Sequence, residues 1–132
     1  VAQAFADGVD EVTPVKPDTI ARSLAIGNPA DGYFALQVAR GTHGVIAWCT
    51  EDEIREGIHL LAETEGVFTE TAGGVTIANL KRLVEDGTIR SDEETVAYVT
   101  GNGYKTIEAF EGHVEPTFHV APDLDEFLAV LG

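Results

Sequence analysis

The sequence predicts a protein of the α/β class, in which strands and helices alternate around a mostly parallel sheet. Two observations point to this class. Short apolar or β-branched runs at 9–12, 43–49, 95–99 and 114–120 have the composition of strands, and the run at 43–49 is apolar enough to be buried on both faces. Segments with helical periodicity and helix-capping residues lie between these runs.

The clearest predicted helix covers residues 50–65. Thr50 and Glu53 form a capping box at its start, and Gly66 is placed to end it. Apolar residues at helical spacing give this helix an inward face. The other predicted helices cover residues 19–25, 31–39, 72–86, 104–110 and 123–131.

For two of the predicted elements, the sequence also predicts how they lie in the fold. In the helix over 31–39, Phe34 and Val38 lie four residues apart, and we expect the face that they share to point inward. In the strand over 114–120, Pro116 cannot donate a backbone hydrogen bond, so we expect this strand at an edge of the sheet.

Composition restricts the classes of function. The chain has 132 residues, enough for one domain with one core. Its 23 acidic and 8 basic residues give a net charge of −15, which argues against nucleic acid or an anionic membrane surface as a partner. No apolar run is long enough to cross a membrane. The acidity also leads to a hypothesis of halophilic adaptation, which requires that the unfolding midpoint rise with salt.

The single cysteine, Cys49, excludes an internal disulfide and fits a reducing cytosol, so we expect a cytoplasmic protein. Cys49 itself is expected to pack as a small apolar side chain. The four histidines are dispersed, and no zinc-type spacing occurs, so no metal site is predicted. Because the sequence begins with valine, we expect it to be a processed chain or part of a longer one.

The loop Thr100-Gly101-Asn102-Gly103 is the first candidate for a ligand site. It lies between the predicted strand over 95–99 and a predicted helix, and open α/β sheets build their ligand sites at such junctions. The glycines allow the backbone to approach a ligand closely, while Thr100 and Asn102 supply a hydroxyl and an amide. The alternative is an ordinary tight turn between a strand and a helix.

A second loop, Glu70-Thr71-Ala72-Gly73-Gly74, opens the helix predicted over 72–86. A carboxylate and a hydroxyl precede the glycine pair, and in a parallel sheet this loop and the first would lie at the same edge and face one pocket. The alternative is an ordinary helix start with Thr71 as its cap.

Three segments, in order along the chain, carry a resemblance to a known family. Residues 19–32 read TIARSLAIGNPADG, residues 65–74 read EGVFTETAGG, and residues 100–106 read TGNGYKT. Together they resemble the carboxy-terminal third of the threonine synthases, which are pyridoxal-phosphate enzymes with the tryptophan-synthase-β-like fold. The resemblance implies that residues 1–132 are a single partial domain, part of the large domain of a fold-type-II enzyme.

The resemblance also implies cofactor-binding roles. Thr100 would hydrogen-bond the pyridine nitrogen of pyridoxal phosphate, and Gly101 and Asn102 would shape the turn beside it. A hydroxyl at this nitrogen, unlike a carboxylate, need not hold it protonated, which favours elimination and replacement chemistry. Three further residues would surround the cofactor: Glu70 and Thr71 at its rim, and Ser23 at one face of its ring.

In this family the reaction converts O-phosphohomoserine and water to threonine and phosphate, so the complete enzyme would be a lyase of threonine biosynthesis. The family's Schiff-base lysine and glycine-rich phosphate loop belong to earlier sequence, and none of Lys16, Lys81 and Lys105 matches the lysine motif. We therefore expect the isolated chain to be inactive and to need the missing amino-terminal portion as its partner. We also expect self-association, for example as a homodimer, through exposed apolar surface.

Two other functions are consistent with the sequence. One is a free-standing, non-catalytic binding or regulatory domain that kept the α/β scaffold and unfolds cooperatively without a partner. The other is the matching part of a related pyridoxal-phosphate dehydratase, which would act on serine or threonine instead of O-phosphohomoserine.

Overall fold

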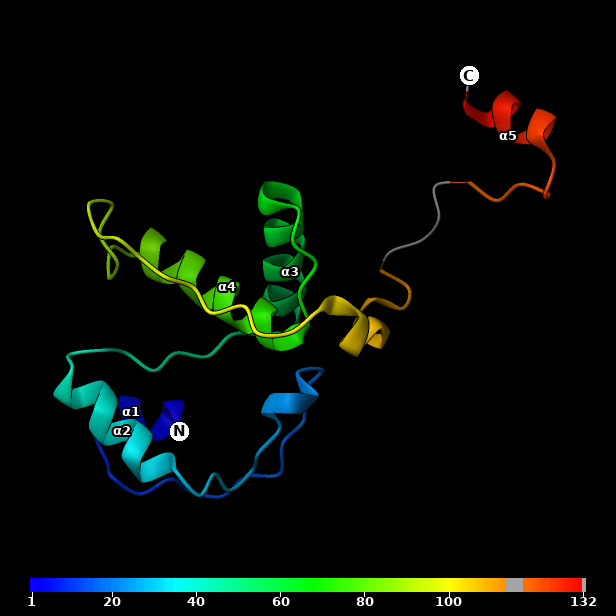
Figure 1. Cartoon of the computed structure of the whole chain (residues 1–132). Coiled ribbons are helices and arrows are strands. Elements are labelled where there is room, and N and C mark those ends of the chain that lie inside the picture. The colour runs from blue at the N-terminus through cyan, green and yellow to red at the C-terminus, as the bar shows by residue number, and fades with distance from the viewer. Residues whose placement is uncertain (114–117, 132) are drawn as a thin grey trace.

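Helices are the regular elements of the computed structural model of this chain, which describes residues 1–113 and 118–131. The two longest, α3 and α4, lie in the middle of the molecule and pack on each other (Figure 1). In chain order, with short 3₁₀ segments marked η, the helices are α1 (Ala2–Ala6), η1 (Arg22–Leu24), α2 (Gly32–Gly41), α3 (Glu51–Glu65), α4 (Thr71–Glu85), η2 (Gly103–Phe110) and α5 (Leu124–Leu131).

The predicted α/β class is wrong, because the described residues contain no strand and therefore no sheet. Residues 114–117 of the last predicted strand lie outside the described residues, and 118–120 form no strand. Three further segments predicted as strands also lack strand structure: 9–12, 43–49 and 95–99.

The physical reason is the lack of pairing partners. An extended segment becomes a strand only when a neighbour exchanges backbone hydrogen bonds with it. In the part of the chain that the structure describes, the one β-type contact is an isolated antiparallel bridge between Thr69 and Asn102. The apolar run at 95–99 instead lies open, with Val96 74% and Tyr98 79% exposed. Its composition is that of a strand, but composition does not supply a partner.

The helix predictions over 50–65 and 72–86 are confirmed as α3 and α4. The two helices are in closest contact at a pair of glycines, one on each helix. A Cβ on Gly57 of α3 would lie 2.6 Å from the carbonyl oxygen of Gly74, and one on Gly74 would lie 2.5 Å from that of Ile54. Both separations are shorter than van der Waals contact, so the two backbones approach this closely only because both residues are glycine.

The capping box at the start of α3 is confirmed. The Glu53 backbone N–H donates to the Thr50 hydroxyl over 3.3 Å, and the Thr50 backbone N–H donates to the Glu53 carboxylate over 2.6 Å. Gly66 ends the helix in the left-handed conformation with φ of 67°, as predicted. The hydrogen bond from the Thr50 backbone, followed by that from its hydroxyl, lowers the pKa of Glu53 below its ordinary value of 4.5.

This lowered pKa predicts a pH-dependent contribution of Glu53 to stability. A carboxyl group with a lowered pKa stabilises the fold above its unfolded pKa, and this stabilisation is lost as the pH falls through the folded pKa. At neutral pH, Glu53→Ala should therefore have a lower urea midpoint than the wild type, and the difference should shrink below pH 4.5. Glu56→Ala, which removes an exposed carboxylate from the same helix outside the cap, is the control and should keep the wild-type urea midpoint at neutral pH.

The core lies where η1, α3 and η2 meet. Ile58 of α3 is 1% exposed, and Phe110 at the end of η2 is 6% exposed. Burial of side chains of this size supplies most of the favourable free energy of folding in a small domain. The buried cluster consists of Ala21, Ile54, Ile58, Ala109 and Phe110, with Ile20, Cys49, Phe68 and Val75 packed against it.

The predicted inward face of α2 is wrong. Phe34 and Val38 are 64% and 65% exposed, whereas Gly32 and Leu36 are buried. A Cβ on Gly32 would lie 2.8 Å from the side chain of Val12, so the segment before α2 packs against this glycine. Close packing at Gly32 turns the helix so that Gly32 and Leu36, four residues apart, face inward.

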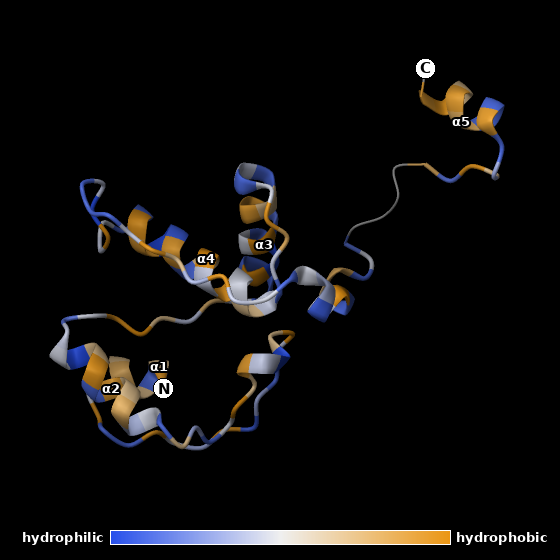
Figure 2. Cartoon of the chain, viewed as in Figure 1, coloured by the Kyte–Doolittle hydropathy of each residue, from blue (hydrophilic) through white to orange (hydrophobic). Residues whose placement is uncertain are grey.

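The last helix, α5, stands apart from the other helices (Figure 1). None of its residues is buried, and most of its residues are hydrophobic (Figure 2). The predicted cap is confirmed, since the Asp123 carboxylate accepts from the Glu126 backbone N–H over 3.0 Å. Among the described residues, no helix has both the length and the apolar character required to cross a membrane.

Candidate functional site

The two loops singled out by the sequence lie against each other. The Glu70 backbone N–H donates to the Gly101 carbonyl over 3.0 Å, and the Thr69 hydroxyl donates to the same carbonyl over 3.1 Å. The Gly103 backbone N–H donates to the Phe68 carbonyl over 3.0 Å. These bonds join segments more than 30 residues apart in the sequence, so the start of α4 and the loop before η2 form one unit.

Each loop leads into a helix whose first backbone N–H groups donate to a side chain. The Asn102 side-chain carbonyl accepts from the Tyr104 backbone N–H over 3.0 Å, which turns the chain into η2. At the other loop, the Thr71 backbone N–H donates to the Thr106 hydroxyl over 3.1 Å. One of the free donors at the start of α4 is therefore satisfied by a side chain of η2.

Glu70, not Thr71, occupies the cap position of α4, and its side chain makes no capping hydrogen bond. The reading of Thr71 as an ordinary cap is therefore wrong. The Glu70 carboxylate instead accepts from Lys105 Nζ over 2.9 Å. The Glu70 side chain is 5% exposed and that of Lys105 is 61% exposed, so a buried carboxylate is paired with a solvent-facing ammonium group.

Gly101 lies directly against the Glu70 side chain. A Cβ built on Gly101 would overlap the carboxylate and would lie 2.8 Å from Glu70 Cγ. The glycine is therefore required by the close approach of the two loops. Its φ does not lie in the left-handed region, so the requirement is steric.

Thr100 and Ser23 are both exposed. Within residues 1–113 and 118–131, the Thr100 hydroxyl makes no hydrogen bond. Ser23 lies in η1, which is tied to η2 by an ion pair of 3.4 Å between Arg22 and Glu108. The described contacts bring Glu70, Thr71, Gly101 and Asn102 together, with Thr100 next in the chain, but they do not include Ser23.

The Thr71 hydroxyl is buried and has no hydrogen-bond partner among the described residues. Thr71 is 0% exposed, and an unsatisfied buried polar group destabilises a protein. Thr71→Val, which keeps the shape and removes the hydroxyl, should therefore raise the free energy of unfolding by about 1–2 kcal/mol. Urea denaturation followed by circular dichroism measures this change.

Thr106→Val is the matched comparison. Thr106 is also buried, at 6% exposed, but its hydroxyl accepts the Thr71 backbone N–H. Its loss leaves that N–H without a partner and should destabilise the chain by about 1–3 kcal/mol. Replacing threonine with valine should therefore raise the free energy of unfolding at position 71 and lower it at position 106. Changes of the same sign at both positions would contradict the view that only the Thr106 hydroxyl has a hydrogen-bond partner among the described residues.

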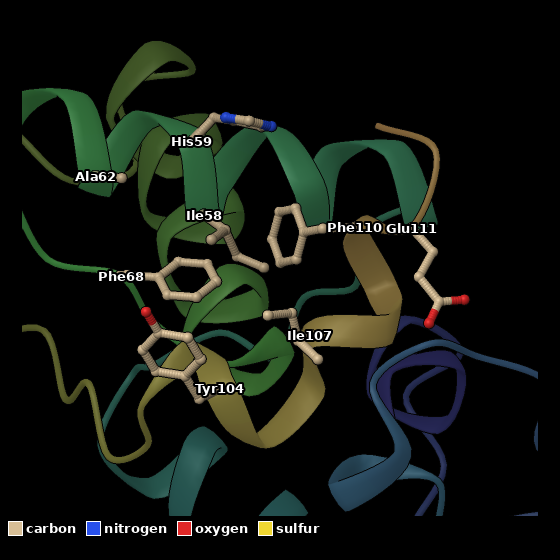
Figure 3. Close-up of a pocket in the computed structure, with 8 residues that line it drawn as sticks. All are labelled: Ile58, His59, Ala62, Phe68, Tyr104, Ile107, Phe110 and Glu111. Atoms are coloured by element: carbon tan, nitrogen blue, oxygen red, sulfur yellow. The ribbon is translucent and has the colours of Figure 1, made fainter. Parts of the chain in front are cut away.

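An apolar hollow of about 470 Å³ lies beside the paired loops, between α3 and η2. Figure 3 shows its aromatic rings gathered around Ile58. The Phe68 ring meets Tyr104 and Phe110 edge to face, with centroids 5.8 Å and 5.5 Å apart. None of the six predicted site residues lines this hollow, so the loops and the hollow are separate features.

Cys49 packs against the buried cluster, as expected from the sequence. Burial, and next the charge of Glu53, raise the pKa of the Cys49 thiol above its ordinary value of 9.0. The thiol therefore stays protonated at neutral pH, which is the state of an inert packing residue and not of a nucleophile.

Comparison with known proteins decides the family. The family described as pyridoxal-phosphate dependent enzyme matches residues 1–101, more than half of the chain. The chain belongs to the pyridoxal-phosphate-dependent enzymes. This membership confirms the resemblance to pyridoxal-phosphate enzymes that the three sequence segments indicated.

The relatives of this chain include proteins named threonine synthase. The one from Bacillus sp. (strain ULM1) is 42% identical over 90 residues, which cover 68% of this chain and 26% of that protein. The one from Methanocaldococcus jannaschii is 35% identical over 132 residues, which cover 99% of this chain and 33% of that protein. The chain thus spans about a quarter to a third of the length of these relatives.

The chemistry of the paired loops is compatible with the cofactor of the family. Two hydroxyls on these loops, that of buried Thr71 and that of exposed Thr100, make no hydrogen bond within residues 1–113 and 118–131. A neutral hydroxyl at Thr100 suits an unprotonated pyridine nitrogen. Sequence reasoning missed three residues that join the two loops, Thr69, Lys105 and Thr106, because their partners lie more than 30 positions away.

Proposed function

We propose that this chain is the carboxy-terminal part of a threonine synthase, and that residues 1–132 form a single partial domain of that enzyme. The complete enzyme is a cytoplasmic lyase of threonine biosynthesis that converts O-phospho-L-homoserine and water to L-threonine and phosphate. One observation carries this proposal: the two loops that match the threonine synthase motifs, distant in sequence, are hydrogen-bonded into one unit.

In this proposal, the residues of the chain bind and orient the cofactor. When bound, pyridoxal phosphate supplies an electron sink for elimination and replacement chemistry. The Thr100 hydroxyl would donate to the pyridine nitrogen, and Gly101 and Asn102 would hold the turn that presents it. Glu70 and Thr71 would lie at the rim of the cofactor, and Ser23 would lie near one face of its ring.

The isolated chain is proposed to be inactive because it lacks the lysine and the phosphate loop of the family. Two of its three lysines are engaged in ion pairs: Lys105 pairs with Glu70 over 2.9 Å, and Lys81 pairs with Glu85 over 3.3 Å. Mixing the isolated chain with pyridoxal phosphate and reducing with borohydride should yield no stoichiometric adduct on a single lysine. Such an adduct on Lys105 would overturn this part of the proposal.

The missing amino-terminal portion is the proposed partner of the exposed apolar residues. Val96 and Tyr98 of the open run at 95–99 are 74% and 79% exposed, and Leu124 of α5 is 70% exposed. Apolar surface of this kind is rare on monomers and marks contact surfaces. Without that portion the chain is proposed to self-associate, and a monomer in a sizing experiment would count against this.

The experiment that tests the function uses the full-length enzyme that contains this chain. Purified with pyridoxal phosphate, it should release phosphate from O-phosphohomoserine and should leave serine and threonine unchanged. Thr100→Val should lower the rate strongly, whereas Thr100→Ser, which keeps the hydroxyl, should retain most of it. Dehydration of serine or threonine instead would assign the chain to a dehydratase, and no turnover of any of these substrates would favour a non-catalytic domain.

A further inference from the structure

The ion pair between Lys105 and Glu70 differs from the other ion pairs in the described part of the chain. Lys105 Nζ lies 2.9 Å from Glu70 Oε1, and the Glu70 side chain is 5% exposed. In each of the other pairs recorded there, the carboxylate side chain is at least 40% exposed. Lys105 therefore neutralises a carboxylate that water does not solvate.

Because the Glu70 carboxylate is buried, loss of this ion pair should cost more free energy than loss of an ion pair at the surface. An exposed pair contributes little, because water and salt screen both charges. A buried carboxylate that loses its partner is left with an uncompensated charge, which is strongly unfavourable. Without Lys105, the Glu70 side chain must therefore turn toward solvent to regain a partner for its charge.

The position of the Glu70 side chain is coupled to the loop that carries Thr100. The carboxylate packs against Gly101, where it fills the space that a Cβ would occupy. The Glu70 backbone N–H is bonded to the Gly101 carbonyl over 3.0 Å, and Glu70 is the cap residue of α4. Movement of the carboxylate must change how Gly101, and with it the preceding Thr100, lies relative to the start of α4.

We propose that Lys105 is a positioning residue for the cofactor. By fixing the Glu70 carboxylate against Gly101, it sets the place of the Thr100 hydroxyl relative to α4 and thereby the affinity for the pyridine ring. This inference rests on the proposed function, since it assumes that the paired loops form a wall of the pyridoxal-phosphate site. Lys105 itself does not touch the cofactor.

The test compares Lys105→Met, Lys105→Arg and Lys81→Met in the full-length enzyme. Lys81→Met is the matched control, because it removes a lysine from an ion pair whose carboxylate is 62% exposed, remote from both loops. Three quantities are measured: the dissociation constant of pyridoxal phosphate, the absorbance maximum of the bound cofactor, and backbone hydrogen exchange over residues 99–106.

Lys105→Met should weaken cofactor binding by about tenfold. A loss of this size lies between the free-energy cost of breaking an exposed ion pair and that of breaking a fully buried one. It should also shift the absorbance maximum and speed hydrogen exchange in the loop. Lys105→Arg should restore much of the affinity, and Lys81→Met should match the wild type. If Lys105→Met and Lys81→Met both bind pyridoxal phosphate like the wild type and exchange alike, the inference is overturned.

A second variant, Glu70→Gln, tests the inference even if Lys105→Met lowers the stability of the enzyme. Glutamine has the shape of Glu70 but no charge, so Lys105→Met should change cofactor affinity much less in a Glu70→Gln background than in the wild type. Equal changes in both backgrounds would show that Lys105 does not act through Glu70. If the wild-type enzyme binds pyridoxal phosphate but does not turn over O-phosphohomoserine, the proposed function fails while these binding measurements still decide the role of Lys105.

Discussion

Replacing Gly101 with alanine is expected to push the Glu70 carboxylate out of its buried position and to loosen the pairing of the two loops. The new Cβ would overlap the carboxylate, which is 5% exposed and has little room to move. Overpacking of this kind destabilises a protein by about 1–3 kcal/mol. Because Thr100 precedes Gly101, cofactor affinity in the full-length enzyme should fall by at least about tenfold, or about 1.4 kcal/mol.

Gly41→Ala is the control for this substitution. Among the described residues, nothing lies within 4 Å of a Cβ built on Gly41, and the φ of Gly41 is not in the left-handed region. Alanine is also a better helix former than glycine, so Gly41→Ala at the end of α2 should be neutral or stabilising. Urea midpoints measure the stability of both variants, and titration with pyridoxal phosphate measures the affinity. Equal midpoints and affinities in the two variants would contradict the steric account of Gly101.

Ile58→Ala is expected to have the largest effect on stability. Ile58 is 1% exposed and lies in the buried cluster with Ile54 and Phe110. Its truncation removes apolar contacts and leaves a cavity that the surrounding helices can fill only in part. Substitutions of this kind lower the free energy of unfolding by about 2–5 kcal/mol. Because small domains have a marginal free energy of unfolding, a loss of this size should unfold much of the protein.

Val84→Ala is the comparison for the core substitution. Val84 lies on α4 and is 49% exposed, so its truncation removes little buried surface. Its expected effect is within about 0.5 kcal/mol, as for other surface substitutions. Helical circular dichroism followed through urea unfolding reports both variants. A small effect of Ile58→Ala would mean that the cluster around α3 and η2 does not hold the chain together.

The helices were predictable because their signals are local. The capping box of Thr50 and Glu53, the left-handed Gly66 and the Asp123 cap are each read from a few neighbouring residues, and the structure has all of them. The inward face of α2 was not predictable, since it depends on the contact of Gly32 with the distant Val12. Local periodicity says that a helix has a face, but only its neighbours decide which face is buried.

The strands were mispredicted for a related reason. The runs at 43–49 and 95–99 have strand composition, but a strand also needs a partner, and a partner is a non-local property. At the site, the sequence indicated the two loops and their match to threonine synthases. It did not indicate the contact of Lys105 with Glu70, because nothing in a lysine after a glycine turn identifies a carboxylate 35 positions earlier.

The arrangement around Trp48 provides the chain with its own fluorescent reporter. Trp48 is the single tryptophan of the sequence, it is 65% exposed, and the Arg82 guanidinium of α4 lies 5.9 Å from its ring centroid and donates to its carbonyl. Emission from an indole shifts to shorter wavelength when water around it is replaced by protein. Tryptophan fluorescence of the unlabelled chain can therefore follow the covering of this surface by another polypeptide, and the rate at which it occurs.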